Sequence, residues 1–177
     1  MKKLILFAFA LIVSFTTTAQ VTKVSNPTSV NPIEFIYEKD EFTDKEYLFI
    51  NKNLLISNDG KKGLYLYPSF TKINGVWSYN GLIGVSNIGN CFENDKIFIL
   101  FEDGTKMEMT SWRDFNCKGD IGFDLHATMR EKLSKPIKGI KFQNGRDYSS
   151  FEKMITDLND KNYFVNVFSA LDEYNKK

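Results

Sequence analysis

Residues 97–110 read IFILFEDGTKMEMT, and this stretch predicts a β-hairpin more clearly than any other part of the chain. Two apolar runs flank Asp103 and Gly104, a pair that tolerates the positive φ angles of a two-residue hairpin turn. Such a turn fixes the register of the strands, so one face of the hairpin would be wholly apolar. The predicted cross-strand pairs are Glu102 with Thr105, Leu100 with Met107, and Phe98 with Met109.

The sequence on either side of this hairpin also favours strands. From Glu34 to about residue 125, short apolar runs alternate with clusters of Asn, Asp and Gly, which is the spacing of antiparallel strands. After that point Ala127 to Leu133 predicts a short helix, which ends before Pro136 because the residue preceding proline avoids helical geometry. Residues 137–142 predict another strand.

Two segments near the C-terminus carry helical spacing. Tyr148 to Leu158 fits an amphipathic helix, which we favour, but Tyr148 to Thr156 would also suit an edge strand. The final segment is clearer, because from about Asn159 its large apolar residues recur on one side of a helix. We therefore expect an α+β fold dominated by its sheet: an antiparallel β-sheet or sandwich with a C-terminal amphipathic helix.

The first 19 residues have the pattern of a cleavable signal peptide. Lys2 and Lys3 precede an apolar run of about a dozen residues, which is shorter than the roughly 20 that a membrane-spanning helix needs. Small residues before Gln20 fit a cleavage site after Ala19, although a retained membrane anchor is the alternative interpretation. Residues 20–33 are polar and predict a flexible N-terminal arm, and residues 34–177 predict a single β-rich domain.

The junction at Ala19 and Gln20, the many Asn residues and the large excess of Lys over Arg resemble exported proteins of AT-rich Bacteroidetes-type bacteria. The resemblance extends to the small secreted β-rich proteins of these bacteria. It implies a periplasmic or secreted product with no membrane span after cleavage, and it implies no mechanism.

Charge argues against several classes of partner. Without Lys2 and Lys3, 21 basic residues face 22 acidic ones, so the processed chain has a net charge of about −1. The lysines are scattered among acidic residues, whereas a nucleic-acid binder needs a clustered basic face to neutralise phosphates. We therefore expect no nucleic-acid partner.

Cys91 and Cys117 are the only cysteines, and an exported chain would reach a compartment in which disulfides persist. The predicted hairpin register, carried outward, places Cys91 opposite position 116, one residue from Cys117. The sequence therefore favours a disulfide between them, with two buried thiols as the alternative. Two thiols titrating in the unreduced, denatured protein would contradict the disulfide.

Chemical motifs are few. His126 is the only histidine and there is no Cys-x-x-Cys, so we expect no metal site and no cofactor. The segment from Glu102 to Asp120 is rich in carboxylates, and two carboxylates about 5 to 10 Å apart would suit a glycoside hydrolase. Turn formation already explains Asp103 and a solvated face explains Glu108, so we favour a structural role for Glu102, Asp103 and Glu108 over a catalytic one.

Aromatic residues supply the one candidate binding surface. Tyr65 and Tyr67 share one side of a predicted strand, as do Trp77 and Tyr79, and neighbouring strands would gather the four rings into a platform for a sugar or peptide. Large aromatic residues are mostly buried, so we favour burial of these rings in the core over the platform. We favour a non-enzymatic exported module that binds a protein or glycan. The alternatives are a hydrolase that uses the carboxylates between Glu102 and Asp120, or a small inhibitor or immunity-type protein.

Overall fold

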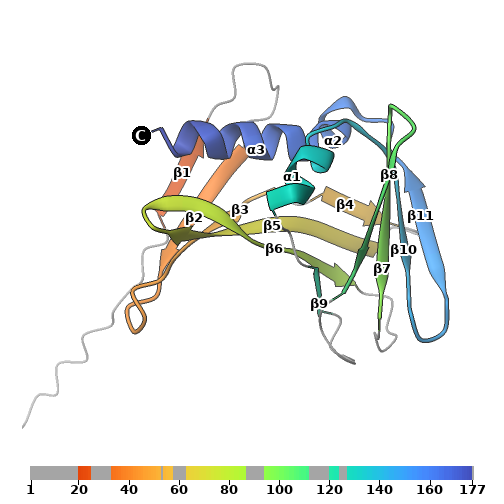
Figure 1. Cartoon of the computed structure of the whole chain (residues 1–177), viewed down its shortest axis with the longest axis horizontal. Coiled ribbons are helices and arrows are strands. Elements are labelled where there is room, and N and C mark those ends of the chain that lie inside the picture. The colour runs from red at the N-terminus through yellow and green to blue at the C-terminus, as the bar shows by residue number, and fades with distance from the viewer. Residues whose placement is uncertain are drawn as a thin grey trace, which may run out of the picture.

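The protein folds as two antiparallel sheets with a C-terminal helix across them (Figure 1). This computed structural model describes residues 20–24, 33–52, 54–57, 63–86, 94–111, 120–123 and 127–176. Within these ranges the chain forms strands β1 to β11 and helices α1 to α3, and none of the helices is long and apolar enough to span a bilayer. The expected α+β, sheet-dominated class is confirmed.

The first sheet has seven strands, in the order β1-β2-β3-β5-β6-β9, with β4 beside β5. The long strand β5 holds this sheet together, because it pairs with β6 on one edge and with both β3 and β4 along the other. The strands are β1 (Gln20–Val24), β2 (Ile33–Lys39), β3 (Glu46–Ile50), β4 (Leu54–Ser57), β5 (Gly63–Ile73), β6 (Val76–Ser86) and β9 (Asp120–Phe123).

The second sheet has four strands, in the order β11-β10-β7-β8. It meets the first sheet along two borders, because Ser111 after β8 bridges to Phe123 in β9 and β11 contacts β4. The strands are β7 (Lys96–Phe101), β8 (Lys106–Thr110), β10 (Ile137–Gln143) and β11 (Ser150–Met154).

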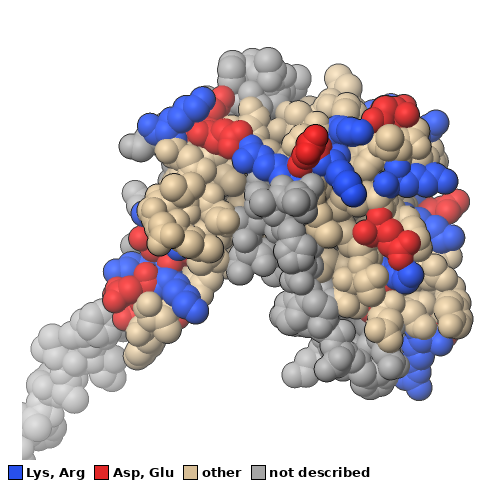
Figure 2. Space-filling model, in the orientation of Figure 1, with Lys and Arg blue, Asp and Glu red and all other residues tan. Residues whose placement is uncertain are grey.

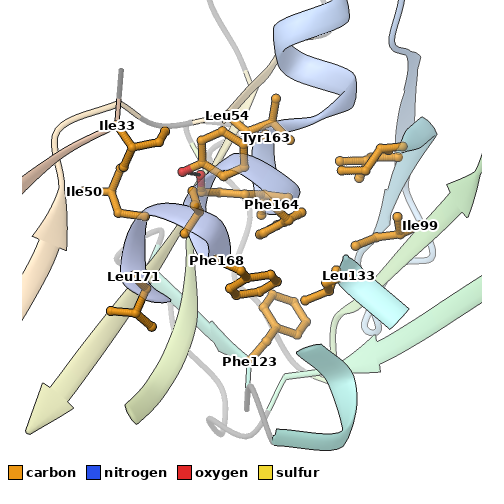
Figure 3. Packing of buried hydrophobic residues seen from close by; sticks show 14 of the residues in the cluster. Ile33, Ile50, Leu54, Ile99, Phe123, Leu133, Tyr163, Phe164, Phe168 and Leu171 are labelled. Carbon is orange, nitrogen blue, oxygen red and sulfur yellow. Dashed lines mark hydrogen bonds between the residues drawn. The ribbon is translucent and has the colours of Figure 1, made fainter. Parts of the chain in front are cut away.

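Helix α3 (Tyr163–Tyr174) closes the core between the sheets, as the amphipathic pattern predicts. The Asp157 carboxylate caps the short helix α2 (Leu158–Lys161) by accepting hydrogen bonds from the backbone N–H groups of residues 159 and 160, close to the predicted start. Figure 3 shows Phe168 of α3 beside Phe123 and Leu133, the last residue of α1 (Ala127–Leu133). The buried residues of α3 are Tyr163, Phe164, Val167, Phe168, Ala170 and Leu171.

Tyr163 fixes the start of α3 to the first sheet. Its hydroxyl lies 2.9 Å from the Lys52 carbonyl oxygen and 3.3 Å from that of Leu66, one just before β4 and the other in β5. Burial raises the pKa of Tyr163 far above its ordinary value, so the phenol is a neutral donor. The helix therefore cannot slide along the sheet without leaving a buried hydroxyl unsatisfied.

The β7–β8 hairpin forms where the sequence predicts it, but the predicted register is wrong by one residue. Ile99 pairs with Met107 and Ile97 with Met109. The loop has three residues, because the Gly104 N–H and the Phe101 carbonyl close one turn and Phe101 then pairs with Thr105. Gly104 has φ 82°, the left-handed residue that such a three-residue loop requires.

Burial explains this register. The core side of β7 is Ile97, Ile99 and Phe101, all buried. The predicted register would have placed Lys106 and Glu108 on that same side, whereas the observed register places Met107 and Met109 there. A shift of one residue turns every side chain of a strand to the other face, so desolvation of two charges selects between the registers.

Two further predictions need correction. Residues 20–24 belong to β1, which pairs with β2 through five residues, so this part of the expected N-terminal arm is a strand. Residues 150–154 form β11, so the helix favoured for Tyr148 to Leu158 is wrong and the edge-strand alternative is correct there. The pairing with β10 decides the second case, because it satisfies backbone groups that a helix would have satisfied internally.

Candidate functional site

Trp77, one of the four predicted platform residues, lies in the core. Its side chain is 7% exposed, and its ring meets Tyr37 and Tyr174 edge-on at centroid distances of 6.2 and 6.0 Å. The Lys72 ammonium lies 5.6 Å from the ring centroid, and the Trp77 backbone N–H donates to the Asn175 side chain. Trp77 therefore joins the end of α3 to the sheet, in agreement with the core burial that we favour for it from the sequence.

The other platform residues do not line up with Trp77. Strands β5 and β6 do pair, but Tyr65 lies opposite Val85 and Tyr67 opposite Ile83. Tyr79 lies opposite Phe70, three residues along β5 from Tyr67. The register thus separates the two tyrosines of β5 from the aromatic pair of β6. The side chains of Tyr65, Tyr67 and Tyr79 lie outside the described part of the structure.

Charged and polar side chains lie beside Trp77 at this end of the core. The Lys72 ammonium pairs with the Glu46 carboxylate at 3.0 Å. Burial, together with the same carboxylate, raises the pKa of Tyr37 above its ordinary value. Tyr37 is therefore a neutral phenol beside the Lys72–Glu46 ion pair.

The three carboxylates predicted near the β7–β8 turn do not converge. Glu102 pairs with Lys161 at 2.6 Å, Asp103 with Lys135 at 2.7 Å, and Glu108 with Lys96 at 2.6 Å. Hydrogen bonds from Lys135 and Thr105 lower the pKa of Asp103 to about 2, which is the opposite of what a general acid needs. Positions 112–119 and the Asp120 side chain lie outside the described structure.

Cys91, Cys117 and His126 also lie outside the described residues, so the disulfide stays a prediction. The hairpin register from which the pairing was extrapolated is shifted by one residue where the structure describes it, from Lys96 opposite Thr110 to Leu100 opposite Lys106. In the part of the chain that the structure describes, no three His, Cys, Asp or Glu side chains are grouped as metal ligands.

A hollow of about 680 Å³ lies on the outer face of the four-stranded sheet, away from the core. Three neighbouring strands supply its apolar centre. Leu100 of β7, Gly139 of β10 and Met154 of β11 lie side by side in one row, and Phe98 lies in the next. We call this surface the outer-face hollow; its main lining residues are Phe98, Leu100, Lys106, Glu108, Gly139, Lys141, Glu152 and Met154.

Gly139 shapes the hollow. A Cβ atom at this position would lie 2.8 Å from the Met154 sulfur, so glycine leaves the space in which the methionine lies across the strand, and a larger residue would displace the thioether. Met154 nevertheless remains 55% exposed. Thioether side chains adapt to irregular apolar partners, so a flexible group covers part of the hollow and can move aside.

Charged residues surround this apolar centre. Glu108 is neutralised by Lys96, whereas Lys106, Lys141 and Glu152 form no ion pair with any residue that the structure describes. The unpaired charges therefore sum to about +1. An apolar centre within a charged rim is the anatomy of a protein interface.

One feature of the sequence, apart from the alternation of its strands, indicates this hollow. An isolated glycine inside a strand indicates a close approach of another group, and Gly139 is such a residue. The wrong register of the β7–β8 hairpin hid the rest, because it assigned Phe98 and Leu100 to the core with the two methionines.

Comparison with protein-family models, with curated proteins and with solved structures finds no significant match to this chain. The resemblance to Bacteroidetes-type secreted proteins thus stays a prediction, and the geometry alone supports the functional argument.

Proposed function

We propose that this chain is an exported, non-enzymatic binding protein that holds a protein ligand against the outer-face hollow. The observation that carries the proposal is the row Leu100, Gly139 and Met154, an apolar surface on a paired sheet that the protein's own core does not use. Binding surfaces built on paired strands keep their shape, so little ordering is needed on association.

The hollow favours a protein over a glycan. Sugar recognition commonly uses an exposed aromatic face, and Trp77, the described member of the predicted platform, is covered by α3. The hollow combines one aromatic residue, Phe98, with aliphatic and thioether groups and with unpaired charges of both signs, which suits apolar side chains flanked by charges. An inhibitor or immunity-type protein would use such a surface in the same way.

The hydrolase alternative has less support. Glu102, Asp103 and Glu108 each pair with a different lysine at the surface, and the pKa of Asp103 lies well below the range useful for proton transfer.

Export is part of the proposal and rests on the sequence. Lys2, Lys3, the apolar run and the small residues before Gln20 support cleavage after Ala19. The residues involved lie outside the described structure.

Site-specific photo-cross-linking tests both parts. A photoreactive amino acid replaces Met154, and in a matched control it replaces Val76, which is 56% exposed on the other sheet. We expect a heavier cross-linked protein species with the probe at position 154 alone, found outside the cytoplasm and beginning at Gln20. The species should be lost when Leu100→Ser is added.

Equal cross-linking at positions 154 and 76 would contradict the binding surface. A cross-link to carbohydrate at position 154 would replace the protein ligand with the glycan alternative. Met1 retained on a chain found inside the cell would contradict export.

A further inference from the structure

The hairpin between β2 and β3 projects from the body of the protein, at the end farthest from the four-stranded sheet (Figure 1). Residues 40–45 form its loop, which we call the hairpin tip. Phe42 lies in this tip and is 100% exposed. Burial of a phenylalanine side chain is stabilising, so the fold leaves this contribution unused.

The tip is ordered although it is exposed. The Asp40 carboxylate accepts hydrogen bonds from the backbone N–H groups of Phe42 and Thr43, at 2.8 and 3.2 Å, and from the Thr43 hydroxyl at 2.7 Å. The Asp40 N–H in turn donates to the Lys45 carbonyl at 2.8 Å. Phe42 is thus presented on a fixed turn, and a fixed aromatic side chain loses little entropy on binding.

The charges around Phe42 are mostly negative. Lys39 and Asp44 neutralise each other in an ion pair of 2.9 Å. Glu38, Asp40 and Glu41 then face a single lysine, Lys45, which leaves a charge of about −2 on the hairpin. Figure 2 shows this small group of charged side chains at the lower left, apart from the charges over the rest of the molecule.

The outer-face hollow has the complementary properties. It has an apolar centre, a volume within the range of sites that take small ligands, and unpaired charges of about +1 from Lys106, Lys141 and Glu152. The four-stranded sheet, which carries the hollow, and the β2–β3 hairpin lie at opposite ends of the molecule in Figure 1, so a tip reaches a hollow only on another copy.

We propose that Phe42 of one copy binds in the outer-face hollow of a second copy. This inference rests on the proposed function and names the protein ligand of the same site. The contact joins two different surfaces, so it is head-to-tail and allows chains of copies to grow. A hairpin tip buries little area, so the association is weak and depends on concentration and salt.

Sedimentation velocity of the purified protein over a range of concentrations tests the inference. We expect reversible self-association that weakens at least tenfold in Phe42→Ser, which removes the ring, and in Met154→Glu, which places a negative charge in the hollow. An equimolar mixture of the two variants should form a 1:1 complex, because one variant keeps its hollow and the other keeps its tip. Val76→Ser, at a position about as exposed as Met154, should associate like the unaltered protein.

Folding of the variants is checked by their thermal unfolding. If Met154→Glu does not fold, Lys106→Glu, at an exposed position on the rim of the hollow, replaces it. Mixing the Lys106→Glu protein with a Glu41→Lys protein should then restore part of the association, because the two charges are exchanged across the contact.

Three outcomes would overturn the inference: a protein that stays monomeric up to about 1 mM, self-association that neither variant weakens, or a mixture that forms no 1:1 complex. If the probe at position 154 still cross-links another protein in cells, the proposed function stands and only the second copy is wrong as its ligand. If it cross-links no protein, both fail.

Discussion

The β2–β3 and β7–β8 hairpins close with the same local chemistry but have different surroundings. In each loop an aspartate accepts hydrogen bonds from backbone N–H groups that follow it: Asp40 from residues 42 and 43, and Asp103 from residue 105. The β7–β8 loop is then tied to the body by Lys135, which pairs with Asp103, and by Lys161, which pairs with Glu102.

The β2–β3 loop has no such ion pair to another element within the part of the chain that the structure describes. Within the described residues, the ion pair formed by its tip joins Lys39 to Asp44 of the same hairpin. Phe42 accordingly points into solvent, whereas Phe101 at the base of the other loop is buried in the core. The comparison teaches that turn chemistry orders a hairpin locally, and that contacts with the rest of the molecule decide whether its apolar residue stabilises the fold or stays available for binding.

The largest expected difference between the two hairpins comes from removing the same ring from each. Phe101→Ala should lower the free energy of unfolding by about 3–5 kcal/mol, because it leaves a cavity in the core. Phe42→Ala should change it by less than about 0.5 kcal/mol, because the ring is fully exposed. Urea denaturation of both variants measures the two values, and similar losses would contradict the distinction.

A smaller difference is expected from the left-handed residues of the loops. Gly104 has φ 82° and open space around it, so Gly104→Ala should lower the free energy of unfolding by about 1–2 kcal/mol through backbone strain alone. Gly104→Asn is the control and should lose less, because asparagine tolerates this conformation better. In the β2–β3 loop Asp44 already has φ 55°, so Asp44→Gly should change stability by less than about 0.5 kcal/mol. Denaturant titration would contradict the strain argument if Gly104→Ala were neutral.

The smallest effect concerns pH. Lys135 and Thr105 lower the pKa of Asp103 from 3.8 to about 2, and hydrogen bonds from Thr43 and the Phe42 N–H lower that of Asp40. A lowered folded-state pKa contributes stability that is fully present above the unfolded value, and this contribution falls away between about pH 4 and pH 2 for Asp103. Both carboxylates are exposed, so the loss is small and screened by salt.

Carboxyl NMR titration separates the two loops. Lys135→Gln should raise the pKa of Asp103 toward 3.8 and leave that of Asp40 unchanged, because the lysine reaches one loop alone. An equal pKa shift of both carboxyl groups would show that the ion pair with Lys135 does not distinguish the hairpins.

The β7–β8 hairpin shows which features the local sequence can predict and which it cannot. The apolar runs and Asp103 with Gly104 locate the hairpin, but the same two residues suit a two-residue and a three-residue loop. The choice between them depends on which face of β7 the rest of the molecule buries. Residues 150–154 present the same problem, because helical spacing and strand alternation both fit there until β10 supplies the partner.

The outer-face hollow could be predicted only in part. Gly139 stands out as an isolated glycine within a strand, but Leu100 and Met154 flank it from strands distant in the sequence. No pattern in the local sequence indicates that these three residues lie side by side on neighbouring strands. Phe42 likewise reads as one aromatic residue among many until the fold leaves it uncovered.

By itself the sequence determined the α+β class, the helix that ends before Pro136 and the amphipathic α3, because periodicity and turn residues act within a few positions along the chain. Tertiary structure alone decided the strand register, the burial of Trp77, the exposure of Phe42 and the outer-face hollow. These features depend on which surfaces lose contact with water, and that is settled only when segments distant in the chain pack together.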